Sequence, residues 1–358
     1  MTVLRSIPIL LICLLSATAY AQVPLTPPAA QPPAAQPPAG KPAAKQEIPK
    51  NATKEPPKPK SPATAKKPAA PSPAASTFDD PNVDLVYGAY QRGLYKTAFD
   101  LATTRAKFAG DPKAMTMLGE LYANALGIKR DDAMAAEWYQ RAANAGDREG
   151  MFALAMMRLA GRGGPTNREE AVKLLASSAK LGNPKAAYNL ALLYLDGQTL
   201  PQDLRRSAEL LRVAADAGNP EAQYALATFY KEGTGVAKDV DKAVRLLQAA
   251  SLADNVDAEV EYAIALYNGS GTPKNEAAAV ALLRKAARQN SPIAQNRLAR
   301  VLVSGQGVPM DKVEGLKWHI VAKTAGKGDP MLDEALADLN PEDRAKAEAA
   351  ARKWIGNK

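Results

Sequence analysis

Six blocks of 36 residues repeat one pattern of apolar and polar positions without a gap, and they begin at Asp111, Asp147, Asn183, Asn219, Asn255 and Ser291. Each block opens on a residue that caps helix N-termini well, and in four blocks a proline follows where its missing N–H costs nothing. An apolar position then recurs at Leu118, Leu154, Leu190, Leu226, Tyr262 and Leu298, beside a column of small residues. The pattern predicts a first helix that neighbouring helices can approach closely.

In five blocks a glycine ends this first helix, at Gly161, Gly197, Gly233, Gly269 and Gly305. Glycine adopts the left-handed backbone of a helix end without strain. A second polar cap follows at Asp131, Asn167, Asp203, Asp239, Asn275 and Asp311, and a second apolar stripe includes Trp138, Leu174, Leu210, Leu246, Leu282 and Trp318. Each block is therefore predicted to form two antiparallel helices of about 13 residues joined by a short loop.

Segments of weaker pattern flank the six repeats at 111–326. Residues 78–110 are predicted to form a degenerate helical pair with Gly93 in its turn, and residues 327–358 to form C-terminal capping helices. Asn340 and Pro341 start the last helix by the same cap-then-proline logic, and we expect Trp354 to cover the end of the core.

The loop and second helix of these blocks resemble the Sel-one-like repeat (SLR) family, a relative of the tetratricopeptide repeats. The family's Gly-x-Gly loop followed by Asp is matched by Gly233, Gly235 and Asp239, and its later Ala-Ala pair by Ala249 and Ala250. The resemblance covers 111–326. It implies an all-α fold, a right-handed α/α superhelical solenoid, and an adaptor role that is often found in bacterial envelope signalling or host contact. Around Asn255 the pattern changes, because Tyr262 replaces leucine and Asp254 replaces the terminal glycine.

Two segments before residue 78 indicate export and a spacer. Residues 1–21 combine Arg5, a short apolar run and small residues at Ala19 and Ala21, which predicts a signal peptide cleaved after Ala21. An uncleaved N-terminal anchor is the alternative. Residues 22–77 contain 16 Pro and 14 Ala and show no periodic apolar face, so we expect a disordered, Pro/Ala/Lys-rich linker. This linker is a passive spacer or contacts anionic envelope material through its lysines.

The sequence offers little material for catalysis. It contains one Cys, placed in the predicted signal peptide, and one His, His319, which replaces a core leucine of the other repeats. A metal cluster, a cofactor site or a nucleophilic triad is therefore not expected, and we predict no enzymatic activity and no small-molecule substrate. Residues Gly161 to Gly164 are glycine-rich but lack the strand and lysine of a phosphate loop. Of the net charge of +9, residues 22–77 carry +6 and Arg5 one more, so residues 78–358 carry +2, which disfavours nucleic acid.

The most informative surface is on the first helices. At 100° per residue, three columns point away from the core leucines, and their central members are apolar or aromatic. The predicted partner-binding residues on this concave face are Phe152, Met156, Tyr188, Leu192, Tyr224, Thr228, Val260 and Ile264. The alternative is that these side chains pack against the first helices of adjacent repeats. Polar Glu120, Asn296 and Arg300 at the ends of the columns would bound the apolar zone.

The sequence thus predicts an exported, periplasmic or secreted repeat scaffold that binds a protein or peptide. By resemblance to the family, it is expected to be a regulator or adaptor in envelope signalling. A cell-wall-associated protein that contacts or modifies envelope polymer is the alternative.

Overall fold

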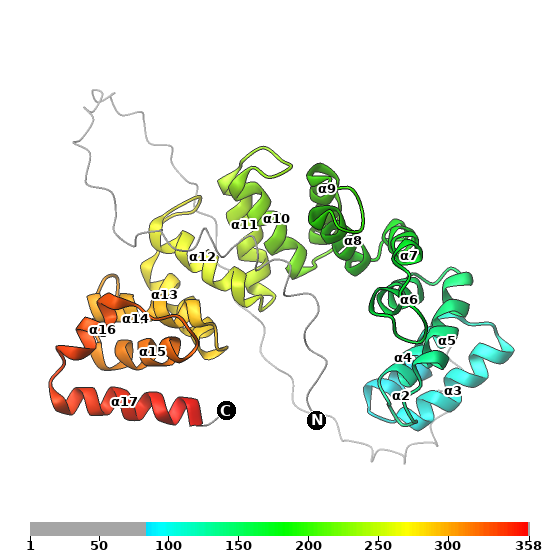
Figure 1. Cartoon of the computed structure of the whole chain (residues 1–358), viewed down its shortest axis with the longest axis horizontal. Coiled ribbons are helices and arrows are strands. Elements are labelled where there is room, and N and C mark those ends of the chain that lie inside the picture. Colours follow the sequence, from blue (N-terminus) through cyan, green and yellow to red (C-terminus); the bar gives the residue numbers. More distant parts are fainter. Residues whose placement is uncertain (1–83, 357–358) are drawn as a thin grey trace, which may run out of the picture. The chain divides into compact units, whose positions relative to one another are not determined.

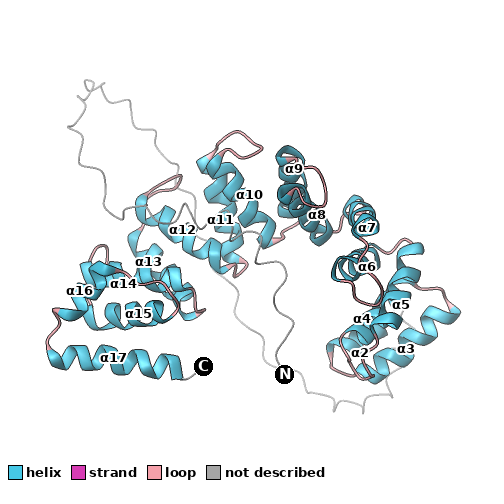
Figure 2. Cartoon of the chain, viewed as in Figure 1, coloured by secondary structure: helices cyan, strands magenta, loops and turns pink. Residues whose placement is uncertain are grey.

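The computed structural model describes residues 84–356, and this range contains helices and loops without strands (Figures 1 and 2). The helices are α2 (Leu85–Gln91), α3 (Tyr95–Phe108), α4 (Pro112–Ala123), α5 (Asp132–Asn144), α6 (Arg148–Ala160), α7 (Arg168–Lys180), α8 (Pro184–Asp196), α9 (Leu204–Asp216), α10 (Pro220–Glu232), α11 (Val240–Leu252), α12 (Val256–Asn268), α13 (Glu276–Arg288), α14 (Pro292–Ser304), α15 (Lys312–Thr324), α16 (Pro330–Ala337) and α17 (Pro341–Gly356). The expected signal peptide (1–21) and linker (22–77) lie outside the described residues.

The helices begin and end where the cap residues predict. At the start of α8 the Asn183 side chain accepts a hydrogen bond from the Ala186 N–H at 3.0 Å, and Asn219 does the same for Ala222 on α10 at 2.7 Å. At the C-terminal end of α10, Gly233 has a φ of +81°. Such a backbone conformation strains any residue with a side chain, so glycine sets the helix end.

Consecutive helix pairs pack as in a solenoid, and each second helix lies between two first helices. α5, for example, packs against α4 of its own repeat and α6 of the next. The predicted leucine column forms the core, since Leu118, Leu154 and Leu298 are fully buried. The small column beside it is equally buried. A Cβ at Gly119 would lie 2.5 Å from the Tyr139 ring, so this close approach of α4 and α5 requires glycine.

On the second helices, Trp138 and Trp318 of the predicted stripe are buried, whereas its four leucines are less buried than the residues that follow them. Leu174, Leu210, Leu246 and Leu282 are half-buried, whereas their successors Leu175, Leu211, Leu247 and Leu283 are buried. A second helix contacts first helices on two sides, so its apolar surface is wider than one column. The buried leucines hold the repeat position of His319, which the sequence assigned to the core.

The loop inside each repeat lies on the start of the preceding repeat's second helix. A Cβ at Gly163 would lie 2.2 Å from the carbonyl oxygen of Asp132, and one at Gly235 would lie 2.3 Å from that of Leu204. The second glycine of the Gly-x-Gly loop therefore permits a backbone contact between repeats. Repeat three has Thr199 at this position, and Thr199 does not adopt a positive φ.

Helices outside the repeats cover the C-terminal end of the core. The ring of Trp354 on α17 meets that of Trp318 on α15 edge to face, with 5.1 Å between centroids. Leu332 of α16 is fully buried in the same cluster. Within residues 84–356, no helix is long and apolar enough to cross a membrane.

Candidate functional site

The structure divides the eight predicted partner-binding residues by exposure. The buried four are Tyr188, Leu192, Tyr224 and Val260. The half-buried four are Phe152, Met156, Thr228 and Ile264. Burial of the first group fits the alternative in which a column packs between repeats. The second group leaves surface that a partner can reach, and its role in binding stays a prediction.

The buried column has a structural reason, because the sixth residue of a repeat reaches the start of the next first helix. Thr116 Oγ1 donates to the Asp147 carboxylate at 2.7 Å, and Asn296 Nδ2 donates to the Asp329 carboxylate at 3.2 Å. Asp147 caps α6 and Asp329 caps α16. Tyr188 and Tyr224 hold the same sequence position in repeats three and four. The angle of 100° per residue predicts which way a side chain points from its own helix. It does not show whether the next first helix covers that side chain.

Tyr188 retains a polar group at this boundary. Its side chain is 6% exposed, and no hydrogen bond joins its hydroxyl to another residue of the described range. Burial raises the pKa of Tyr188 to about 12, and the carboxylate of Glu221 on α10 contributes to the rise. The charge of Glu221 at the start of α10 therefore acts on the Tyr188 side chain of α8.

Carboxylates that sequence reasoning did not single out occupy the same side of the central first helices. On α10, Glu221, Thr228 and Glu232 are spaced at i, i+7 and i+11, which places them along one helix face. The acidic residues of this side are Asp196, Glu221, Glu232, Asp257 and Glu261, and we call them the central acidic face. The spacing of i, i+7 and i+11 on α10 is visible in the sequence and could have revealed this face.

The members of the central acidic face differ in how they are neutralised. The Lys231 Nζ of α10 lies 2.9 Å from a Glu261 carboxylate oxygen of α12, which joins the two first helices. In the described part of the chain, Glu221, Glu232 and Asp257 have no ion pair. Partial loss of water around the Asp257 carboxyl, followed by repulsion from Glu261, raises the pKa of Asp257.

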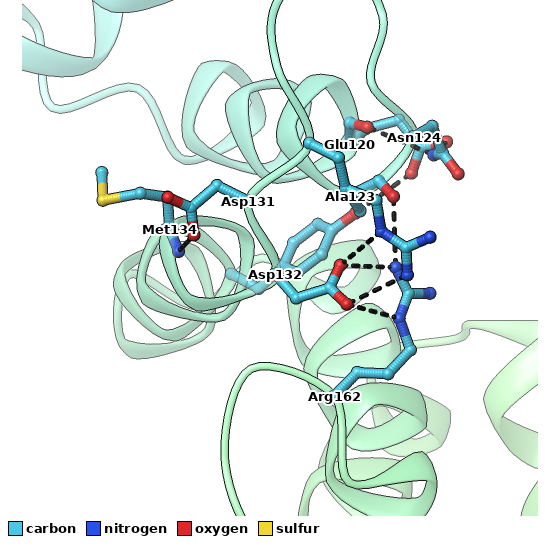
Figure 3. Close-up of polar contacts among 9 residues, drawn as sticks. Glu120, Ala123, Asn124, Asp131, Asp132, Met134 and Arg162 are labelled. Carbon is cyan, nitrogen blue, oxygen red and sulfur yellow. Dashed lines mark hydrogen bonds and ion pairs between the residues drawn. The ribbon is translucent and has the colours of Figure 1, made fainter.

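A different arrangement holds repeats one and two together. Arg162, in the loop after α6, reaches back to α5, where its Nη2 lies 2.8 Å from Asp132 Oδ1 (Figure 3). The same Nη2 donates to the Ala123 carbonyl of α4 at 3.1 Å, and Arg130 donates to both oxygens of the Asp132 carboxylate. The hydrogen bonds from Arg162, then those from Arg130, hold the pKa of Asp132 well below its usual range.

Glu120 at the edge of this junction is also occupied. It accepts a hydrogen bond from the Tyr139 hydroxyl at 3.0 Å and another from Asn124 Nδ2 at 2.7 Å. Burial, then the charge of Glu120, raises the pKa of Tyr139 above its ordinary value. The glycine-rich segment from Gly161 to Gly164 thus contains an arginine that binds the neighbouring repeat.

His319 is fully buried on α15 and joins the last repeat to its cap. Its Nε2 lies 2.8 Å from Asp333 Oδ1 of α16, and Lys323 Nζ lies 2.6 Å from the same oxygen. Hydrogen bonds from Lys323 and then His319 lower the pKa of Asp333. Among residues 84–356, no group of three or more His, Cys, Asp or Glu side chains is arranged to hold a metal ion.

The fold and its surfaces define a helical repeat scaffold. A profile of the Sel1 repeat matches six consecutive segments, at 112–147, 148–183, 184–219, 220–255, 256–291 and 292–327. The chain belongs to the Sel1 repeat family, which confirms the resemblance seen in the sequence. Proteins of this family are generally scaffolds for protein–protein interaction and are typically not enzymes.

Two solved structures share this fold at 26% sequence identity. The match to a Sel1 repeat protein from Oxalobacter formigenes covers 68% of this chain and 100% of that one, with a TM-score of 0.61. The match to c5321, a protective antigen of uropathogenic Escherichia coli with an SLR fold, covers 73% of this chain and 64% of that one, with a TM-score of 0.51. None of the curated proteins compared with the chain matches it.

Proposed function

We propose that this protein is an exported scaffold that holds a protein or peptide partner on the exposed side of its central first helices. The observation that carries the proposal is the half-buried position of Thr228 and Ile264, on neighbouring helices that a direct ion pair connects. Met156, Thr228 and Ile264 hold the same repeat position on α6, α10 and α12 and are half-buried, so they offer contact area without unfolding of the array.

The proposed location is the bacterial envelope, where the scaffold acts as a regulator or adaptor in signalling. Residues 1–21 support export, because they have the composition of a cleaved signal peptide. One relative is described as a protective antigen, and accessibility to the host fits an exported protein. The eight lysines of residues 22–77 suit contact with anionic envelope material, which would hold the scaffold near its partner.

Export is tested by N-terminal sequencing of the protein extracted from the periplasm. The proposal predicts a chain that begins at Gln22. A chain that keeps Met1 and stays in the cytoplasm would contradict it.

The binding face is tested by placing a bulky side chain on it. Thr228→Trp should abolish capture of the partner from a native envelope extract, because the indole would occupy the contact surface. Val213→Trp on α9 is the matched control, since Val213 is 50% exposed on a second helix. Both variants should keep the helical content and melting midpoint of the parent. Equal capture by both variants would contradict the proposed face.

A further inference from the structure

We propose that the partner presents a basic segment, whose Lys or Arg side chains pair with the central acidic face while its apolar side chains lie near Thr228 and Ile264. This proposal rests on the proposed function, because it names the chemistry of the partner bound by the same first helices. It assigns a ligand class to the members of the central acidic face other than Glu261, which have no ion pair in the described part of the chain.

Charge is segregated between the two sides of repeats three to five. The first helices α8, α10 and α12 contain six carboxylates and two lysines, a net charge of −4. The second helices α9, α11 and α13 of the same repeats contain eight basic residues and four carboxylates, a net charge of +4. The helices of these repeats are therefore neutral in sum. Glu259 is fully buried and pairs with Lys285 of α13, and the remaining charges still make the first-helix side negative and the second-helix side positive.

The segregation is confined to the centre of the array. The first helix α6 of repeat two carries two arginines and one glutamate, and α14 of repeat six carries two arginines and no carboxylate. At the ends of the apolar columns, Glu120 and Arg300 are bound within the protein, Arg300 by Asp329 at 2.5 Å. The free carboxylates thus lie beside the half-buried central residues.

Helix stability does not explain the carboxylates at the C-terminal ends. Asp196 is the last residue of α8 and Glu232 is the last residue of α10. The C-terminus of a helix carries partial negative charge, so a carboxylate there is unfavourable unless a cation compensates it. Neither residue has an ion pair in the described part of the chain. A cation on the partner would supply the missing compensation.

Like charges one helical turn apart point to the same conclusion. Asp257 and Glu261 lie at i and i+4 on α12, where two carboxylates repel each other. Lys231 reaches Glu261 but not Asp257, and partial loss of water, followed by repulsion from Glu261, raises the pKa of Asp257. A cationic side chain near the start of α12 would relieve this repulsion.

Tyr188 is an independent observation at the same place. Its hydroxyl belongs to a side chain that is 94% buried, has no hydrogen-bond partner among the described residues, and lies in the field of Glu221. Tyr188 packs in a core cluster that includes residues of α8, α9 and α10, and burial, followed by the charge of Glu221 on α10, raises the pKa of its hydroxyl. An ammonium or guanidinium group donates to both kinds of acceptor.

The test uses three labelled 15-residue peptides that share alanine and leucine positions and differ in one variable residue, lysine, glutamine or glutamate. Fluorescence anisotropy with the full chain measures their affinities. The lysine peptide should bind most tightly and the glutamate peptide most weakly. Added salt should weaken binding of the lysine peptide, because exposed ion pairs are screened.

Two variants with the same change of charge locate the binding. Glu221→Gln with Glu232→Gln removes two exposed carboxylates from α10 on either side of Thr228, and should weaken the lysine peptide roughly fivefold. The control, Glu209→Gln with Asp216→Asn, removes two exposed carboxylates from the second helix α9 and should change affinity less than about twofold. The glutamine peptide should respond to neither variant.

Equal affinity of the lysine and glutamine peptides would overturn the inference. It would also be overturned if the α9 control variant lost as much affinity for the lysine peptide as the α10 variant, because that result would indicate an effect of net charge alone. Tightest binding of the glutamate peptide would instead assign the second-helix face to an acidic partner. If Thr228→Trp blocks capture of the native partner while the α10 charge variant does not, the proposed function stands and the basic partner is wrong. If Thr228→Trp leaves capture intact, the proposed function itself fails.

Discussion

At the junction of repeats one and two, the Asp132 carboxylate accepts hydrogen bonds from two guanidinium groups and Glu120 accepts two hydrogen bonds (Figure 3). On α10, by contrast, Glu221 and Glu232 remain exposed without an ion pair among the described residues. The two regions share one repeat pattern and nearly identical helices. The repeat pattern therefore determines the backbone and the core of both regions. The carboxylates differ, because those at the first junction bind neighbouring residues of the protein, whereas those on α10 can still bind a partner.

We expect the largest loss of stability from a substitution at the close loop contact between repeats one and two. Gly163→Ala combines a φ of +70° with a Cβ that would lie 2.2 Å from the Asp132 carbonyl oxygen. We expect a loss of about 3–4 kcal/mol in the free energy of unfolding, measured by urea denaturation. Gly146→Ala is the control, because Gly146 has a φ of +85° with nothing within 4 Å, and should cost about 1 kcal/mol. If both variants lost the same free energy of unfolding, the backbone strain of a residue with positive φ would explain the whole effect, and the close contact between repeats would contribute nothing.

Removal of a carboxylate should distinguish the two regions directly. Asp132→Asn should lower the free energy of unfolding by about 1–2 kcal/mol, because two guanidinium groups lose their charged acceptor. Glu221→Gln should change it by less than about 0.5 kcal/mol. A loss at Glu221 as large as that at Asp132 would mean that the central acidic face is also used for cohesion.

The Asp132 contribution should depend on pH with a defined sign. Its folded-state pKa lies below the unfolded value, so the carboxylate stabilises the protein fully above the unfolded pKa of about 3.9. This contribution is lost as the pH falls below that value toward the folded pKa. The difference between the parent and Asp132→Asn, followed by thermal melting from pH 7 to pH 3, should therefore shrink at acidic pH. A difference that grows on acidification would contradict the ion-pair arrangement.

Glu232→Gln should have a small effect of the opposite sign. Its carboxylate at the end of α10 opposes the helix dipole, so we expect the variant to gain about 0.3–0.5 kcal/mol. Thermal or urea unfolding of the two proteins in parallel measures the gain. A destabilised variant would show that Glu232 contributes to the fold.

Removal of residues 22–77 should have the smallest effect on stability. This segment has no periodic apolar face to contribute to a core, so the melting midpoint should move by no more than about 2 °C. Differential scanning calorimetry of the full and shortened chains tests this expectation. A large drop would show that the segment stabilises the helical array.

The repeat period was readable from the sequence because caps, glycines and core leucines recur every 36 residues. Asn183, Leu154 and Gly233 all take the places expected from local rules for helix starts, cores and helix ends. These rules depend on neighbours along the chain. The sequence assigned no role to Arg162 of the glycine-rich loop, and in the structure Arg162 binds Asp132 of the neighbouring repeat.

The candidate site was less predictable because exposure depends on the adjacent repeat. Tyr188 and Thr228 were assigned to one surface by angular position, but the start of the next first helix covers Tyr188 and leaves Thr228 half-exposed. The central acidic face was missed for a related reason. The ion pairing that separates Asp132 from Glu221 involves residues of two repeats, so it becomes visible only when the repeats are placed side by side.

The most direct test of the central claim is photo-cross-linking in living cells. A photoreactive amino acid at position 228 on α10 should yield a cross-linked partner, because that side chain lies on the proposed binding face. The same amino acid at position 213, an exposed site on the second helix α9, should yield none. A partner cross-linked from position 213 and not from 228 would place binding on the second helices and contradict the account.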